Sequence, residues 1–213
     1  MIKAILFDCD GVLVDMADCH YRALNCALKE ICGYEIPYDL HLKYYNGLPT
    51  NAKAELLIRR GIISNKEERE KVWEKKQQYT FEFIKLLNID AIKVELHREL
   101  HRTYRLACVS NSIRATLTEM LRTTGQLDFM TFILGNEDFG DRPKPCPEPY
   151  LLAFQKMNLQ PQECLIVEDS PKGILAAQRS KAHVVETTFE KVNIKNIKEA
   201  INRANEGEMI IPI

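Results

Sequence analysis

Short apolar runs recur along most of the chain and alternate with segments of helical periodicity. Strand candidates lie at about 2–7, 105–109, 131–134, 164–168 and 183–186. Runs of this length, bounded by polar residues, are typical of buried strands. Beyond residue 92 helical patterns separate the runs, which is the order expected of parallel strands joined by crossover helices. The pattern therefore predicts a doubly wound α/β core built on a parallel sheet.

The segment that follows the first strand departs from this alternation. Residues 16–88 contain no convincing strand. Apolar positions instead recur at helical spacing in three stretches, 17–32, 51–60 and 65–87. We therefore expect a helical domain inserted directly after the first strand. This division assigns 1–15 and 89–213 to the α/β core, with hinges near 13–15 and 88–90.

Composition narrows the classes of partner. The 213 residues suffice for one sizeable domain and a smaller one. Lys and Arg number 29 against 30 Asp and Glu, so the chain has no overall charge to attract nucleic acid or an anionic membrane. No segment approaches the ~18 to 20 apolar residues of a membrane span, and Asp8 and Asp10 interrupt the apolar start that a signal peptide would need. We therefore expect neither a nucleic-acid nor a membrane partner.

The seven cysteines follow no repeated spacing, and their number is odd. Such a set indicates reduced thiols and a cytoplasmic protein rather than a disulfide framework. Cys9 lies between Asp8 and Asp10, and its side chain should point to the opposite face. We expect Cys9 to be buried there as a small apolar residue.

The most informative chemistry lies in residues 7–15, FDCDGVLVD, directly after the first strand. Asp8 and Asp10 are two residues apart, so their side chains can point the same way, and Gly11 lets the backbone turn sharply. Two carboxylates this close repel each other unless a proton or a cation offsets their charge. Oxygen ligands of this kind suit Mg²⁺. For Asp-x-Asp alone, an acidic turn without a metal is an equally good interpretation.

A second apolar run ends in small hydrogen-bonding residues. Residues 104–112, YRLACVSNS, bring Ser110 and Asn111 to the end of a predicted strand. A hydroxyl and loop N–H groups at this place can hold phosphate oxygens. The alternative is a turn that caps the next helix.

Two further segments carry charged side chains at similar places. Residues 142–149, RPKPCPEP, hold Lys144 in a backbone stiffened by prolines, although a single loop lysine can also be only a solvated charge. Residues 163–174, ECLIVEDSPKGI, form an apolar run that ends in the acidic pair Glu168 and Asp169. Ligands of open α/β sheets gather beyond the carboxyl ends of the strands, which is where these motifs fall.

The four segments, in this order, resemble the motifs of the haloacid dehalogenase superfamily in its phosphatase and phosphomutase branch. The matched pattern covers essentially the whole chain, and the helical insertion stands in the place of the family's cap domain. The resemblance implies phosphoryl transfer, with Asp8 as the nucleophile and Asp10 as the general acid/base. An aspartyl-phosphate intermediate would split one difficult step into two easier ones.

The same resemblance assigns the remaining site residues. Ser110, Asn111 and Lys144 would hold the phosphoryl oxygens, and Lys144 would also offset the charge of the nucleophile. The implied cofactor is Mg²⁺, with Asp169 as the likelier direct ligand and Glu168 bound directly or through water. The full set of implied metal ligands is Asp8, the main-chain carbonyl of Asp10, Glu168 and Asp169.

The helical insertion should choose the substrate, as lids do when they close over a ligand and exclude water. The stretch around His20 resembles the β-phosphoglucomutase group, in which a cap histidine links proton transfer to substrate binding. Lys75 resembles a cap lysine of that group that contacts substrate. The alternative for both is an ordinary surface position on a helix.

Other positions differ from that mutase group. In the mutase group, a cap loop that resembles Lys-Gly-x-x-Arg supplies two cations for the second phosphate of the substrate. Residues 46–50, NGLPT, stand at this place, so both cations are missing. Lys53 could replace them only from a different direction, and Met16 follows Asp15 where Ser or Thr is usual. These differences favour a Mg²⁺-dependent phosphatase that acts on a small phosphorylated metabolite with one phosphate. A sugar phosphate fits best.

Alternatives and smaller features stay open. A β-phosphoglucomutase-like sugar phosphomutase is the close alternative, and a non-catalytic binding or regulatory protein on the same fold is an alternative of another class. Dehalogenation is weaker still. His97 and His101 lack further zinc ligands nearby, so we expect structural or solvated roles for them. The apolar end, 209–213, should dock on the core or on a partner, and the oligomeric state is undetermined.

Overall fold

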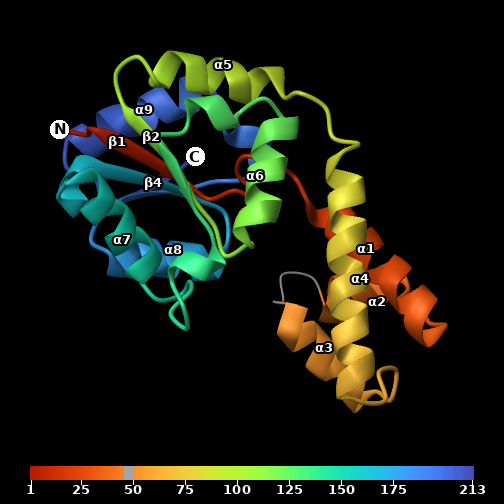
Figure 1. Cartoon of the computed structure of the whole chain (residues 1–213). Coiled ribbons are helices and arrows are strands. Elements are labelled where there is room, and N and C mark those ends of the chain that lie inside the picture. The colour runs from red at the N-terminus through yellow and green to blue at the C-terminus, as the bar shows by residue number, and fades with distance from the viewer. Residues whose placement is uncertain (46–49) are drawn as a thin grey trace. The chain divides into compact units, whose positions relative to one another are not determined.

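The chain divides into two compact units, which are described separately. The computed structural model describes residues 1–45 and 50–213. One unit comprises 1–15 together with 87–213, and the other comprises 16–86 (Figure 1). The first unit contains the sheet, and the second is helical.

A parallel sheet forms the centre of the first unit. Within the described residues it has six strands in the order β3-β2-β1-β4-β5-β6. Their bounds are β1 Ala4–Phe7, β2 Arg105–Val109, β3 Phe132–Leu134, β4 Cys164–Glu168, β5 His183–Glu186 and β6 Ile210–Pro212. β1 lies between β2 and β4, in a register that pairs Phe7 with Cys108 on one side and Val167 on the other. The predicted doubly wound α/β core is confirmed, and the carboxyl ends of these three strands meet at one edge.

Helices cover both faces of this sheet. The α-helices of the unit are α5 Ala91–Leu100, α6 Arg114–Thr123, α7 Glu148–Met157, α8 Pro171–Arg179 and α9 Ile194–Asn205. Short 3-10 turns lie at η1 Leu127–Phe129, η2 Asn136–Asp138, η3 Pro161–Glu163 and η4 Phe189–Lys191. Figure 1 shows α5 and α9 on one face and α7 and α8 on the other. Because helices cover both faces, β1 and β4 are buried along their full length, which explains their uninterrupted apolar sequences.

Polar side chains fix where several of these helices begin. Asp90 accepts a hydrogen bond from the main-chain N–H of Lys93 and caps α5. Ser170 caps α8 in the same way through Gly173, and Asn193 caps α9. An oxygen at this position satisfies one of the N–H groups that the first turn leaves without a partner. The cap at Ser170 also fixes the chain immediately after the acidic pair at the end of β4.

The C-terminal residues form a strand that the sequence pattern did not predict. β6 pairs in parallel with β5, with Val184 opposite Ile210 and Val185 opposite Ile211. Ile211 is fully buried, so the apolar end docks on the core of its own unit. Three residues are too few to show the alternation that identifies a strand. The edge of β5 supplies the strand that pairs with this segment, and Arg203 of α9 also donates to the carbonyl oxygen of Pro212.

The second unit is built from helices around its own apolar core. Its helices are α1 Ala17–Cys32, α2 Tyr38–Tyr44, α3 Thr50–Arg59 and α4 Lys66–Ile84. α1 and α4 pack against each other, and the sequence pattern did not predict α2. The core includes Leu24, Leu28, Ile36, Leu57, Ile63 and Val72. In the described part of the chain, no helix combines the length and apolar character that crossing a membrane requires.

His97 is a buried histidine of α5 and is not solvated. Its ring packs edge-on against Phe7, with the centroids 5.2 Å apart, and lies near Phe129. Neither ring nitrogen has a hydrogen-bond partner among the described residues. Burial, together with the charge of Lys93, lowers the pKa of His97 to about 3. The folded protein therefore holds this ring neutral.

We expect His97 to make the protein sensitive to mild acid. An unfolded chain binds a proton at His97 below a pH of about 6.5, whereas the folded chain does not. The free energy of unfolding should therefore be highest above this pH and fall towards the folded pKa of about 3. Between pH 7.5 and 5.5 this group should remove about 1.4 kcal/mol. Urea denaturation across this range measures the slope.

The variant His97→Leu should flatten this part of the pH profile. The matched control is His101→Gln, because His101 is an exposed histidine just beyond the end of the same helix. This control should keep the wild-type slope. Equal slopes for wild type and His97→Leu would show that other groups cause the acid sensitivity.

Candidate active site

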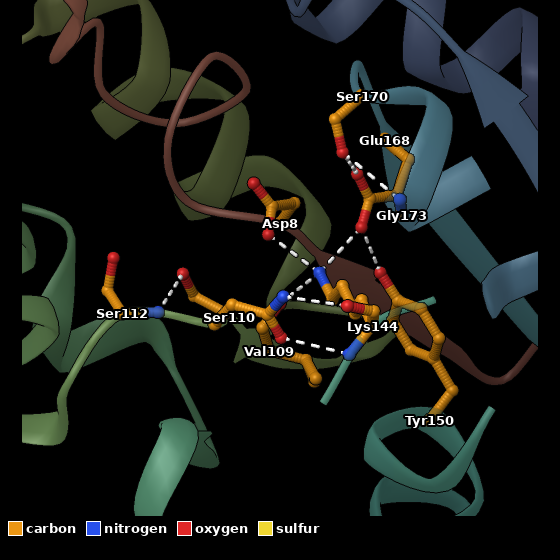
Figure 2. Close-up of polar contacts among 10 residues, drawn as sticks. Asp8, Val109, Ser110, Ser112, Lys144, Tyr150, Glu168, Ser170 and Gly173 are labelled. Atoms are coloured by element: carbon orange, nitrogen blue, oxygen red, sulfur yellow. Dashed lines mark hydrogen bonds and ion pairs between the residues drawn. The ribbon is translucent and has the colours of Figure 1, made fainter. Parts of the chain in front are cut away.

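The candidate site lies where β1, β2 and β4 end. Asp8 directly follows β1, and its main-chain N–H donates to Val167 of β4 at 3.0 Å. Ser110 follows β2, and Glu168 is the last residue of β4. Parallel pairing brings these three positions to the same edge of the sheet, although they are far apart in sequence. Figure 2 shows these three residues and the contacts that link Asp8 and Glu168 to Lys144.

Lys144 is the centre of this group. Its Nζ lies 2.6 Å from Asp8 Oδ1, 2.5 Å from Glu168 Oε1 and 2.7 Å from the carbonyl oxygen of Val109 (Figure 2). An ammonium group has three N–H donors, so these contacts use all of them. Burial disfavours the charged amine, but the carboxylates of Asp8 and Glu168 raise the pKa of Lys144 well above its usual range. Lys144 is therefore a buried cation that joins two carboxylates, and not a solvated loop residue.

Asn111 holds the main chain of Lys144. Its side-chain Nδ2 donates to the carbonyl oxygen of Lys144 at 3.1 Å, and its Oδ1 accepts from the N–H of Lys144 at the same distance. The peptide bond between Lys144 and Pro145 is cis. The side chain of Asn111 thus has a positioning role that the sequence did not indicate. Phosphate binding by its main-chain N–H stays a prediction.

Ser110 lies beside this clamp. It is buried, and its Oγ accepts a hydrogen bond from the N–H of Ser112 at 3.2 Å (Figure 2). A hydroxyl that accepts in this way keeps its own O–H available as a donor. The position is consistent with the predicted contact to a phosphoryl oxygen, which stays a prediction.

Three carboxylates form an acidic cluster next to Lys144. One oxygen from each of Asp8, Glu168 and Asp169 lies within 4.8 Å of the others. With the charge of Lys144, the four ionised groups sum to −2, since there are three negative groups and one positive. Burial raises the pKa of Asp8 despite the opposing effect of Lys144, and burial with the nearby charges of Glu168 and Asp10 raises the pKa of Asp169 to about 6. Burial is the largest cause of both shifts, and neighbouring carboxylates add to it.

The donor set fits a divalent cation. Oδ1 of Asp169 is buried and accepts no hydrogen bond within the described residues. Gly11 has φ +85°, and a Cβ at this position would come within 2.1 Å of Asp169 Oδ2. The missing side chain at Gly11 therefore makes room for the carboxylate of Asp169. Carboxylate oxygens of this kind are ligands for hard divalent cations.

The loop after Asp8 places Asp10. The N–H groups of Leu13 and Val14 both donate to the carbonyl oxygen of Cys9, which closes a tight turn around Gly11. Cys9 is fully buried, and Asp10 is half-buried. The carboxylate of Asp10 is not part of the three-residue cluster. Its predicted roles, as acid/base and through its carbonyl as a metal ligand, stay predictions.

Sequence reasoning missed Tyr150. Its hydroxyl donates to Glu168 Oε1 at 2.5 Å, and Lys144 Nζ lies 4.9 Å from the centre of its ring (Figure 2). The signal in the sequence was weak. It consisted of a tyrosine at a buried position of a helix, where the hydroxyl needs a partner.

The predicted substrate residues His20 and Lys75 belong to the helical unit, which is described by itself. Lys75 is about one-third exposed and forms an ion pair with Glu30 at 2.6 Å, and Tyr79 donates to the same carboxylate. His20 is half-buried in α1. Residues 46–49, which include Asn46 of the altered loop, lie outside the described residues. Contacts of His20 and Lys75 with substrate stay predictions.

Comparisons with known proteins identify a family and a shared fold. A family model described as "Haloacid dehalogenase-like hydrolase" matches residues 5–187. The phosphoglycolate phosphatase of Nitrosospira multiformis is 28% identical over 189 residues, which cover 86% of this chain and 82% of the relative. The phosphorylated carbohydrates phosphatase of Thermotoga maritima is 26% identical over 216 residues, covering 99% and 95%. A crystal structure of β-phosphoglucomutase from Clostridium difficile shares the fold, with a TM-score of 0.77, 22% identity and coverage of 97% and 100%.

Proposed function

The chain belongs to the haloacid dehalogenase-like hydrolases, and we propose that it hydrolyses a small phosphomonoester, with a sugar phosphate as the preferred class. The observation that carries the proposal is the buried Lys144, which joins Asp8 to the acidic cluster. This arrangement supplies a carboxylate nucleophile, a cation for the phosphoryl oxygens and ligands for a metal. The names of the two relatives, a phosphoglycolate phosphatase and a phosphorylated carbohydrates phosphatase, support the substrate class.

In the proposed reaction, a carboxylate oxygen of Asp8 attacks the phosphorus atom of the substrate. The new bond forms an aspartyl-phosphate, and the bond between phosphorus and the leaving oxygen breaks. Asp10 gives its proton to that oxygen, so the alcohol leaves neutral. Asp10 then takes a proton from water as the water attacks phosphorus, which releases inorganic phosphate and restores Asp8.

Lys144 stabilises the charge that develops during both steps. In the substrate-free site one of its three donors faces Asp8, and the other two are held by Glu168 and Val109. We infer that the donor facing Asp8 turns to a phosphoryl oxygen when substrate binds. The clamp from Asn111 keeps the main chain of Lys144 in place during this exchange. Fixed donors in a buried site stabilise charge more strongly than water does.

Asp8, Asp169, Glu168 and the carbonyl of Asp10 would hold Mg²⁺. When bound, Mg²⁺ supplies positive charge that shields the phosphoryl oxygens and orients the transferring group. Two glycines make room for the carboxylates of this site. Gly11 leaves room for Asp169, and Gly173 leaves room for Glu168, since a Cβ at Gly173 would come within 2.0 Å of Glu168 Oε2.

A sugar phosphomutase is the second candidate, and the similarity to the fold of β-phosphoglucomutase supports it. The two candidates differ in what discharges the phosphoenzyme. Water discharges a phosphatase, whereas a second sugar phosphate discharges a mutase. The loop 46–50 lacks both cations that would bind a distal phosphate, which favours water.

We expect inorganic phosphate to accumulate in step with the loss of a sugar phosphate. The assay uses β-glucose 1-phosphate and a panel of other sugar phosphates with Mg²⁺, and it measures both phosphate and glucose 6-phosphate. A sugar bisphosphate should not stimulate the reaction, and EDTA should stop it. Conversion of β-glucose 1-phosphate to glucose 6-phosphate with little phosphate release would instead favour the mutase. No turnover of any phosphate ester, with p-nitrophenyl phosphate included, would favour a binding protein.

A further inference from the structure

Tyr150 is a buried tyrosine of α7 whose hydroxyl meets a buried carboxylate. The residue is fully buried among apolar side chains such as Leu6, Phe154 and Ile166. Its hydroxyl donates to Glu168 Oε1 at 2.5 Å, and Glu168 is itself fully buried. A buried hydroxyl costs free energy unless it is hydrogen-bonded, and a phenylalanine would fill the same space without that cost. The tyrosine hydroxyl is therefore best explained by its contact with Glu168.

The two oxygens of Glu168 have different surroundings. Oε1 accepts from both Lys144 Nζ and the hydroxyl of Tyr150 (Figure 2). Among the described residues, Oε2 accepts one hydrogen bond, a long one of 3.4 Å from Ser170 Oγ. Oε1 is therefore the anchored oxygen, and Oε2 is the oxygen that can serve a metal.

We propose that Tyr150 is a positioning residue that fixes the carboxylate of Glu168 so that its Oε2 can serve the metal site. This inference rests on the Mg²⁺ site of the proposed function. Lys144 alone would not fix the carboxylate, because its Nζ is shared between Glu168 and Asp8. A second donor on Oε1 holds the plane of the carboxylate from another direction. Hydrogen-bond partners behind a metal ligand set its orientation in this way.

The test is direct binding of Mg²⁺ to the substrate-free protein by calorimetry. Tyr150→Phe keeps the ring in the core and removes only the hydroxyl. We expect the dissociation constant for Mg²⁺ to rise about tenfold, as is typical when the partner of a metal ligand is lost. Most of the wild-type kcat should return at saturating Mg²⁺, because Tyr150 does not touch the reacting atoms. An unchanged dissociation constant would overturn the proposal.

Two further variants separate positioning from general stability. Phe154→Leu loosens the same helix and the same core without touching Glu168, so it should lower the melting temperature and leave Mg²⁺ affinity unchanged. In a Glu168→Gln background, Tyr150→Phe should have little further effect on Mg²⁺ affinity, because the two changes act through one carboxylate. Additive losses in this double-mutant cycle would contradict the proposal.

Calorimetry of the wild type and of Tyr150→Phe separates an error in the proposed metal site from an error in the role of Tyr150. If the wild-type protein binds no Mg²⁺ by calorimetry, the proposed metal site is wrong, and the role of Tyr150 is overturned with it. If the wild type binds Mg²⁺ and Tyr150→Phe binds it equally well, only the role of Tyr150 is wrong.

Discussion

The variant Asp8→Asn is expected to lower the rate of phosphate release by at least about a thousandfold, because it removes the attacking carboxylate. The fold should survive the change. An asparagine has nearly the same shape, and its side-chain oxygen can still accept the hydrogen bond that Lys144 now gives to Asp8 Oδ1. The measurement is steady-state release of inorganic phosphate from the best substrate of the panel. Circular dichroism confirms that the variant is folded.

Acid quenching of the wild-type enzyme during turnover tests the same assignment directly. A phosphoryl adduct should be found by peptide mass spectrometry on Asp8. The matched control is Asp128→Asn, which makes the same chemical change at an exposed position of the same unit and should keep the wild-type rate. An adduct on any other residue would disprove the role of Asp8.

The second large effect is expected from Lys144→Met. This variant keeps the length and apolar body of the side chain but leaves Asp8, Glu168 and the phosphoryl group without their cation. We expect kcat/KM to fall by about a hundredfold to a thousandfold, as when a fixed donor is removed from a buried site. Lys144→Arg should not restore the rate, because a planar guanidinium does not match three acceptors arranged around a compact ammonium.

The control for Lys144 is Lys156→Met, an identical change at an exposed position of α7. It should leave kcat/KM unchanged. A melting curve shows whether Lys144→Met is folded, and Mg²⁺ binding by calorimetry shows whether its metal ligands remain in place. A folded Lys144→Met variant with wild-type kcat/KM would mean that the contacts of Lys144 serve only the structure.

The sequence predicted the α/β core because its strands are buried on both faces. Such strands consist of uninterrupted apolar runs, and polar residues mark their ends. The same argument found Asp8, Ser110 and Glu168, since each stands at or directly after the end of such a run. The sequence did not predict the short strand β6, because three residues show no periodicity and the strand depends on pairing with β5.

The sequence did not predict roles that depend on contacts between side chains far apart along the chain. Nothing in the pattern showed that Asn111 clamps the main chain of Lys144, or that Tyr150 reaches Glu168. The sequence also left open whether His97 is structural or solvated, and the structure shows that it is buried. These contacts join residues that are between 18 and 90 positions apart, such as the pairs Tyr150–Glu168 and Phe7–His97.

By itself, the sequence determined the residue types of the candidate site and the strand ends at which they stand. Residue types and apolar periodicity are local properties, so they can be read along the chain. Only the tertiary structure showed that Lys144 donates its three hydrogen bonds to Asp8, Glu168 and Val109. It alone also showed that Tyr150 donates to one oxygen of Glu168. The physical reason is that the order of strands in the sheet sets these distances, and no local pattern records that order.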